Sequence, residues 1–299
     1  MVSIRLMAAT PLALSGLNDM PPQAFVAALA QVFEHAPWVA EAALTGRPYP
    51  TLAALHHRMM GAVRAADPAK QLAFIAGHPE LGSRVKRGDW TDASRAEQGS
   101  LGLDRLGAEE FERFMRLNRA YREKFGFPFI ICVRRHTRDS ILTQFERRLR
   151  HDIAAERASA LDEIGFITRL RLVGLVDGPG KPQTEGRLST HVLDTVVGRP
   201  AAGVKIALHE IGASARGLLA ERVTNAEGRT DTPLIAGEPL RIGAYELSFQ
   251  VGDYFRRAAM ADPAYLDVVP IRFSIAEPEG HYHVPLLVTP WSYTTYRGS

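Results

Sequence analysis

Cysteine is almost absent from this sequence of 299 residues, in which Cys132 is the only one. A single thiol cannot form an intrachain disulfide and cannot build a cysteine-based zinc site. No stretch reaches the roughly 20 consecutive apolar residues that a membrane-spanning helix requires. The N-terminal segment also lacks the charged block and long apolar region of a secretory signal. We therefore expect a cytoplasmic protein with no membrane partner.

Excess charge of one sign is also small. The 36 Lys and Arg residues nearly balance the 33 Asp and Glu residues, and the formal net charge is +3. No basic run is interleaved with aromatic residues, as a nucleic-acid-binding stripe would need, so we expect no nucleic-acid partner. The mild positive excess suits small anionic substrates.

The first half of the chain has apolar residues at helical spacing. Phe25, Leu29 and Val32 form one such stripe, and similar stripes recur along the following segments. This spacing predicts an all-α helical domain over residues 1–176. At 299 residues, the chain is long enough for this domain and a second one, at about 150 residues each.

The second half begins after a change of composition. Residues 177–186 are rich in Gly, Pro and polar side chains, which is typical of a linker. Apolar and polar residues then alternate, as in Val269, Ile271 and Phe273. Several short strands with Gly and Pro between them predict an all-β sandwich over residues 187–299. We also expect one short helix around Tyr254–Met260.

Two histidines stand two residues apart in the segment HYHVPLL. On a strand, His281 and His283 therefore face the same side. Such a pair can be structural, can bind a metal, or can perform acid–base chemistry. The metal alternative is the weaker functional one, because no carboxylate or cysteine cluster stands nearby in the sequence.

Three blocks of the second half carry a resemblance to a known family. They are LSTHVLDTVVGRPAAGV at 188–204, TNAEGRTD at 224–231 and HYHVPLLVTPWSYTTYRGS at 281–299. Together they resemble the 5-hydroxyisourate hydrolases, the enzymatic branch of the transthyretin-like family. The resemblance implies that the catalytic residues are His191, Arg229 and His283. We assign substrate binding to His281 and to the terminal Tyr296, Arg297, Gly298 and Ser299.

The chemistry of ring opening suits these side chains. Histidine has the intrinsic pKa for activating a water molecule near neutral pH. An arginine can hold the oxygens of a urate-like ring and stabilise the charge that develops on the attacked carbonyl. No metal and no organic cofactor is required. Glu227 departs from the family pattern, which more commonly has Asp before Gly-Arg.

The first half resembles the OHCU (2-oxo-4-hydroxy-4-carboxy-5-ureidoimidazoline) decarboxylases from its first helix to about Val176. The motifs are GHPELG at 77–82, SRAEQ at 94–98 and KFGFPFIICVRRH at 124–136. The resemblance implies proton transfer by His78, and we assign Glu97 to orienting His78 or the substrate hydroxyl. The expected substrate-binding residues are Pro79, Ser94, Gln98, Phe129, Ile131, Val133 and Arg171. Gly82, Leu101 and His151 depart from the family pattern, at positions that affect packing more than chemistry.

The decarboxylation needs no cofactor, because the substrate carries its own electron sink. The carbon that bears the carboxylate adjoins a ring C=N bond, so pyridoxal, thiamine or a metal is unnecessary. The product of the hydrolase reaction is also the substrate of the decarboxylase reaction. The two resemblances together imply a two-domain enzyme that converts 5-hydroxyisourate to (S)-allantoin.

Two alternatives compete with this hypothesis. Transthyretin uses the same β-fold as a hormone carrier without catalysis, although a carrier has no need of His191, Arg229 and His283 together. A metal-dependent hydrolase that uses His281 and His283 is the second alternative. Both families also imply a homo-oligomer, a dimer or a tetramer, that acts on small molecules.

Overall fold

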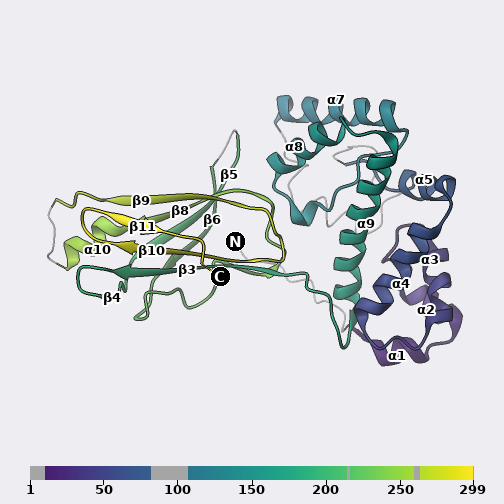
Figure 1. Cartoon of the computed structure of the whole chain (residues 1–299), viewed down its shortest axis with the longest axis horizontal. Coiled ribbons are helices and arrows are strands. Elements are labelled where there is room, and N and C mark those ends of the chain that lie inside the picture. The colour runs from purple at the N-terminus through teal and green to yellow at the C-terminus, as the bar shows by residue number, and fades with distance from the viewer. Residues whose placement is uncertain (1–10, 82–106, 214–215, 259–262, 299) are drawn as a thin grey trace. The chain divides into compact units, whose positions relative to one another are not determined.

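The computed structural model describes residues 11–81, 107–213, 216–258 and 263–298 (Figure 1). The chain divides into two compact units. The first comprises Met1–Val133 with Ile141–Gln183, and the second comprises Arg134–Ser140 with Thr184–Ser299. The first unit is mainly helical and the second is mainly β-strand. Among the helices described, none is both long enough and apolar enough to cross a membrane.

Several helices of the first unit begin where the sequence provides a capping side chain or a proline. Thr51, Asp67 and Asp152 each accept a hydrogen bond from a backbone N–H of the helix that follows. Gly126, with φ of 78°, ends a long helix in the left-handed conformation that favours glycine. The helices are α1 Leu14–Asp19, α2 Pro22–Ala28, α3 Pro37–Ala43, α4 Leu52–Ala65, α5 Pro68–Ala76, α7 Ala108–Phe125, α8 Arg138–Arg148 and α9 Ile153–Leu175, with 3-10 turns at Leu44–Gly46 and Val133–Arg135.

The first unit is not purely helical. Strand β1, Leu12–Ala13, pairs in parallel with strand β2, Val176–Asp177. The chain after β2 continues along the start of α4, where Leu52 N–H donates to the Pro179 carbonyl at 3.0 Å and Ala53 N–H to that of Gly180 at 3.1 Å. These bonds satisfy N–H groups that the first turn of a helix leaves without an internal partner.

The second unit consists of two sheets. One has the strand order β11-β10-β3-β4, with β7 also pairing with β3, and the other has the order β6-β5-β8-β9. The strands are β3 Gly186–Asp194, β4 Arg199–Pro200, β5 Lys205–Ile211, β6 Arg216–Val223, β7 Ile235–Glu238, β8 Gly243–Gln250, β9 Val268–Ile275, β10 His281–Val288 and β11 Tyr293–Thr295.

The apolar side chains of alternate strand positions form the core of this unit. Leu188, Val192, Leu247 and Phe249 are fully buried, as the alternating sequence pattern predicts. The short helix α10 covers Val251–Arg257, so it starts three residues before the expected Tyr254. It starts early because Val251 and Phe255, one helical turn apart, are both buried in the core.

Candidate active sites

The pairing of β3 with β10 brings the histidines of the second unit together. The two strands are parallel, with His281 opposite Arg187, His283 opposite Ser189, and Pro285 opposite His191. Side chains at alternate positions share a face, so Arg187, Ser189 and His191 lie on the same side of the sheet as His281 and His283. The opposite face carries the buried apolar residues. Segments almost 100 residues apart in sequence thereby form one polar surface.

A cavity of about 190 Å³ lies over this polar surface. The Ser189 hydroxyl is 3.0 Å from His281 Nε2 and 3.0 Å from His283 Nδ1. Four polar neighbours, Arg187, Ser189, Thr190 and Thr230, were not among the residues assigned from the sequence. The cavity is lined by Arg187, Ser189, Thr190, Arg229, Thr230, Pro233, His281 and His283.

A tight turn places Arg229 beside His191. Asn225 holds the turn, since its backbone N–H donates to the Arg229 carbonyl at 2.7 Å and its side-chain oxygen accepts from Arg229 N–H at 3.1 Å. Arg229 then forms a β-bridge with His191. Gly228 has φ of 69°, and a Cβ there would lie 2.3 Å from the Val192 carbonyl oxygen. Only glycine fits this position, whereas Glu227 is exposed.

Burial and positively charged neighbours both lower the pKa of His191 and of His283. Desolvation lowers the pKa of His191, and the charge of Arg229 lowers it further. Desolvation also lowers the pKa of His283, followed by the charges of Arg229 and of the other histidines. Both imidazoles are therefore neutral near pH 7 and can accept a proton. His191 does not line the cavity, and its buried Nε2 has no hydrogen-bond partner among the described residues.

The end of the chain returns to His283. Gly298 N–H donates to the His283 carbonyl at 2.9 Å, and a Cβ at Gly298 would lie 2.7 Å from His283 Cδ2. Tyr296 and Arg297 do not line the cavity. Arg297 instead lies 3.6 Å from a carboxylate oxygen of Glu277, and Tyr296 is exposed. Ser299 lies outside the described residues.

In the first unit, His78 is buried just after α5. Its Nδ1 is 3.0 Å from the Phe74 carbonyl oxygen, and its ring meets the Phe74 ring edge-on. Desolvation lowers the pKa of His78, while the Phe74 hydrogen bond and the charge of Glu34 oppose the shift. The next residue, Pro79, is half-buried.

Arg171, on α9, is one of the charged residues that act on His78. It forms an ion pair with Glu34, at 3.2 Å between Nη1 and Oε2, and the two side chains are only 9% and 1% exposed. Glu34 was not assigned from the sequence, because a lone glutamate between two short helices gives no signal. The charges of Glu34 and Arg171 both act on His78. Ser94, Glu97 and Gln98 lie outside the described residues, as do Gly82 and Leu101.

The segment that carries Phe129, Ile131 and Val133 is buried in the helical core. The Phe129 ring stacks on Phe145 with centroids 3.7 Å apart, and the Arg148 guanidinium lies over the Phe129 ring, 4.5 Å from its centroid. The Phe129 side chain therefore serves packing.

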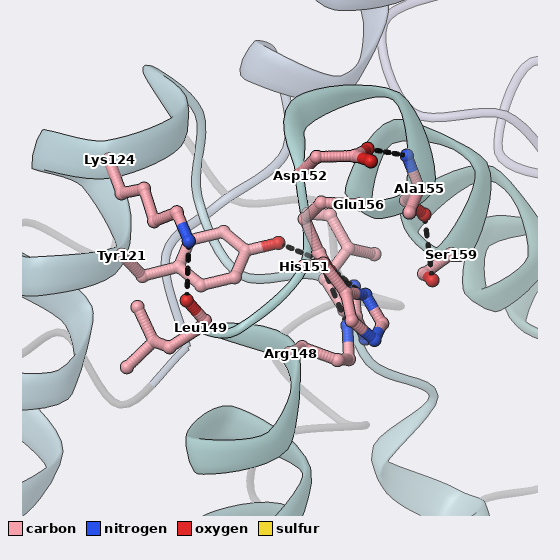
Figure 2. A network of polar contacts seen from close by, with 10 residues as sticks. Tyr121, Lys124, Arg148, Leu149, His151, Asp152, Ala155, Glu156 and Ser159 are labelled. Atoms are coloured by element: carbon pink, nitrogen blue, oxygen red, sulfur yellow. Dashed lines mark hydrogen bonds and ion pairs between the residues drawn. The ribbon is translucent and has the colours of Figure 1, made fainter.

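A buried polar network is centred on Glu156 and includes Arg148, Tyr121 and His151 (Figure 2). Glu156 is fully buried, and one of its oxygens accepts from Arg148 Nε at 2.9 Å, from Arg148 Nη2 at 2.5 Å and from the Tyr121 hydroxyl. His151 Nδ1 lies 2.9 Å from the other oxygen. Arg148 also donates to the Ile130 carbonyl at 2.7 Å, which fixes the backbone beside Phe129. His151, a departure from the family pattern, is thus a partner of this network.

The described part of the chain contains no group of three or more His, Cys, Asp or Glu side chains placed to hold a metal ion. His281 and His283 instead share the hydroxyl of Ser189. Their ring centroids are 6.4 Å apart.

Two family models match the chain, one on each side of the composition change. The OHCU decarboxylase model matches residues 18–173, and the HIUase/Transthyretin family model matches residues 188–298. The 5-hydroxyisourate hydrolase of Deinococcus radiodurans is 56% identical over 113 residues, which cover 38% of this chain and 95% of the relative. The 2-oxo-4-hydroxy-4-carboxy-5-ureidoimidazoline decarboxylase of Haloferax volcanii is 43% identical over 161 residues, which cover 54% of this chain and 94% of the relative.

One solved structure is similar over nearly the whole length. A crystal structure of (S)-allantoin synthase is 34% identical, covers 97% of this chain and 100% of its own, and gives a TM-score of 0.54. Both matches therefore occur together in one solved protein.

Proposed function

Because the chain belongs to the OHCU decarboxylase family over residues 18–173 and to the HIUase/transthyretin family over residues 188–298, we infer that it is a bifunctional enzyme of urate degradation. It converts 5-hydroxyisourate to allantoin in two steps. The second unit hydrolyses the lactam, and the first unit decarboxylates the product. The allantoin formed is the (S) isomer.

Ring opening takes place at the cavity over β3 and β10. Water adds to the lactam carbonyl and the C–N bond breaks, so that a carboxylate forms and the nitrogen gains a proton. His283 and His191 exchange the protons of this step, and Arg229 stabilises the negative charge that develops on the attacked carbonyl oxygen. The observation that carries this proposal is the convergence of Arg229 and His283 on one cavity, next to His191. His281, which lines the cavity, assists in holding the substrate, whereas the parts of Tyr296, Arg297, Gly298 and Ser299 in binding stay predictions from the resemblance.

Decarboxylation takes place around His78. The C–C bond to the carboxylate breaks, carbon dioxide leaves, and the electron pair moves into the adjacent ring C=N bond. His78 delivers a proton to one face of the ring, which sets the configuration of the product. Arg171 contacts the anion, and its ion pair with Glu34 supports this role by fixing its position. Glu97 orients His78 or the substrate hydroxyl.

The test supplies freshly prepared 5-hydroxyisourate to the purified chain. Its ultraviolet absorbance reports ring opening, and the circular dichroism of the product reports (S)-allantoin. We expect Arg229→Ala to stop ring opening only, and His78→Ala to stop decarboxylation only, so that the ring-opened intermediate accumulates. Loss of 5-hydroxyisourate consumption in His78→Ala would contradict the division into two sites.

We also infer that the chain assembles as a homo-oligomer, either a dimer or a tetramer. Large apolar side chains are exposed near the edge strand β11, among them Trp291 at 64% and Tyr293 at 44%. Exposed apolar side chains that gather at a strand edge are typical of a surface that another chain covers. Light scattering of the purified protein measures the mass directly, and a monomer at micromolar concentration would contradict the proposal.

A further inference from the structure

The hydroxyl of Ser189 lies between two imidazoles. Its oxygen is 3.0 Å from His281 Nε2 and 3.0 Å from His283 Nδ1, and all three side chains line the same cavity. We propose that Ser189 is a positioning residue for ring opening, which links His281 to His283 and orients the His283 ring so that its Nε2 exchanges protons with the reacting water. This inference rests on the proposed role of His283 as the base.

The single hydroxyl proton of Ser189 couples the protonation of the two imidazoles. Ser189 carries one hydroxyl proton and can donate it to only one of the two ring nitrogens at a time. When Ser189 donates to His281 Nε2, it accepts from His283 Nδ1–H, and His283 Nε2 is then unprotonated and can act as a base. When His283 Nε2 takes a proton from the attacking water, its Nδ1 proton can pass to Ser189 and the Ser189 proton to His281 Nε2. His283 then stays neutral with its proton on Nε2, and His281 becomes the imidazolium. When His283 Nε2–H then protonates the leaving nitrogen, the protons return from His281 through Ser189 to His283 Nδ1, so one chain of hydrogen bonds serves both the base step and the acid step.

The surroundings explain why a hydroxyl serves here. In many catalytic sites a carboxylate orients the histidine and stabilises its charged form. No carboxylate is among the described residues that line this cavity, and the charged groups facing His283 are Arg187 and Arg229. A neutral hydroxyl can orient the ring without adding negative charge, so His283 stays neutral near pH 7. The chain passes close to the same ring at Gly298, where a Cβ would lie 2.7 Å from His283 Cδ2.

The experiment compares Ser189→Ala with Ser189→Thr in the full chain. Ser189→Ala removes only the hydroxyl. We expect kcat for ring opening to fall about 10- to 100-fold, with a smaller change in KM. This is part of the roughly 10²- to 10⁴-fold rate increase that positioned proton transfer contributes. Ser189→Thr keeps the hydroxyl on a side chain that suits a strand, so it should retain most of kcat. Equal losses in the two variants would overturn the proposal.

A double-mutant cycle with His281→Ala tests the chain of hydrogen bonds. If both residues act through His283, Ser189→Ala with His281→Ala should be no slower than Ser189→Ala alone. If the fold-losses in kcat of the two single variants multiply in the double variant, the proposed link from His281 through Ser189 to His283 is wrong. Nitrogen chemical shifts of labelled histidines give a second readout, because Ser189→Ala should change the ratio of the His283 tautomers.

The controls separate this inference from the proposed function. Decarboxylation of the ring-opened intermediate should be unchanged in every Ser189 variant, which shows that the helical unit is folded, and the ring opening retained by Ser189→Thr shows the same for the second unit. If His283→Ala keeps the parental rate of ring opening, the proposed role of His283 is wrong. If His283→Ala loses the activity while Ser189→Ala keeps the parental kcat and tautomer ratio, only the role of Ser189 is wrong.

Discussion

Replacing Glu156 by Gln should destabilise the helical unit strongly. Gln is almost the same size, so no cavity forms, but the guanidinium of Arg148 loses its buried carboxylate. The two side chains are 0% and 2% exposed, and removing one partner of a buried ion pair costs about 3–5 kcal/mol. For a unit of this size, 1 kcal/mol lowers Tm by about 2–4 °C, so the expected fall in Tm is about 6–20 °C.

The exposed ion pair between Arg113 and Glu146 provides a matched control. Its side chains are 45% and 49% exposed, so Glu146→Gln should cost about 1 kcal/mol or less. Differential scanning calorimetry of the full chain, with circular dichroism at a helix-sensitive wavelength, follows the transition of the helical unit. A Tm for Glu156→Gln within about 3 °C of that for Glu146→Gln, a difference of about 1 kcal/mol, would refute the reasoning.

Three further predictions concern the sites and the boundary between the units. Gly298→Ala should lower the rate of ring opening, because the added methyl group would lie 2.7 Å from the His283 ring. At Gly217 an added methyl group meets nothing within 4 Å, so Gly217→Ala should leave the rate unchanged in the same absorbance assay. Because the pKa of His283 is lowered, its neutral, basic form persists to lower pH. The value of kcat/KM for ring opening should therefore decline only below pH 6.5, the ordinary histidine value. A decline centred above pH 6.5 would contradict the assignment of His283 as the base. A fragment of residues 1–183 should be more stable to urea than one of residues 1–176, because the shorter fragment loses two backbone hydrogen bonds to the start of α4. The expected difference in the free energy of unfolding is about 1–3 kcal/mol. Equal midpoints of urea unfolding would count against this.

The periodicity of apolar residues was sufficient to predict the type of most elements. Helical spacing predicted the helices that carry Phe25 and Phe145, and strict alternation placed His281 and His283 on one face of a strand, as the structure has them. Both features depend on residues a few positions apart. Such local patterns follow from backbone geometry, so they can be read from one sequence.

The partners across the fold could not be predicted in this way. Ser189 contacts His283 only because β3 and β10 pair in one particular register, although the residues are 94 positions apart. Glu34 and Arg171 are 137 positions apart, and neither has a pattern around it that indicates the other. The pair β1–β2 is two residues long on each side, too short for alternation to be visible. Composition likewise predicted irregular structure after residue 176, but it gave no indication that residues 179 and 180 bond to α4.

The parallel pairing of β3 with β10 has a consequence for the order in which the chain matures. Synthesis proceeds from the N-terminus, and domains generally fold as units when they emerge. Arg187, Ser189 and His191 leave the ribosome early in the second unit, yet their strand partner spans His281–Val288. The helical unit can fold while the second unit is still being translated, whereas the cavity over β3 and β10 cannot form until residues beyond 281 are free to pair. A ribosome-bound nascent chain would therefore acquire its two activities in the reverse of the order in which the substrate needs them.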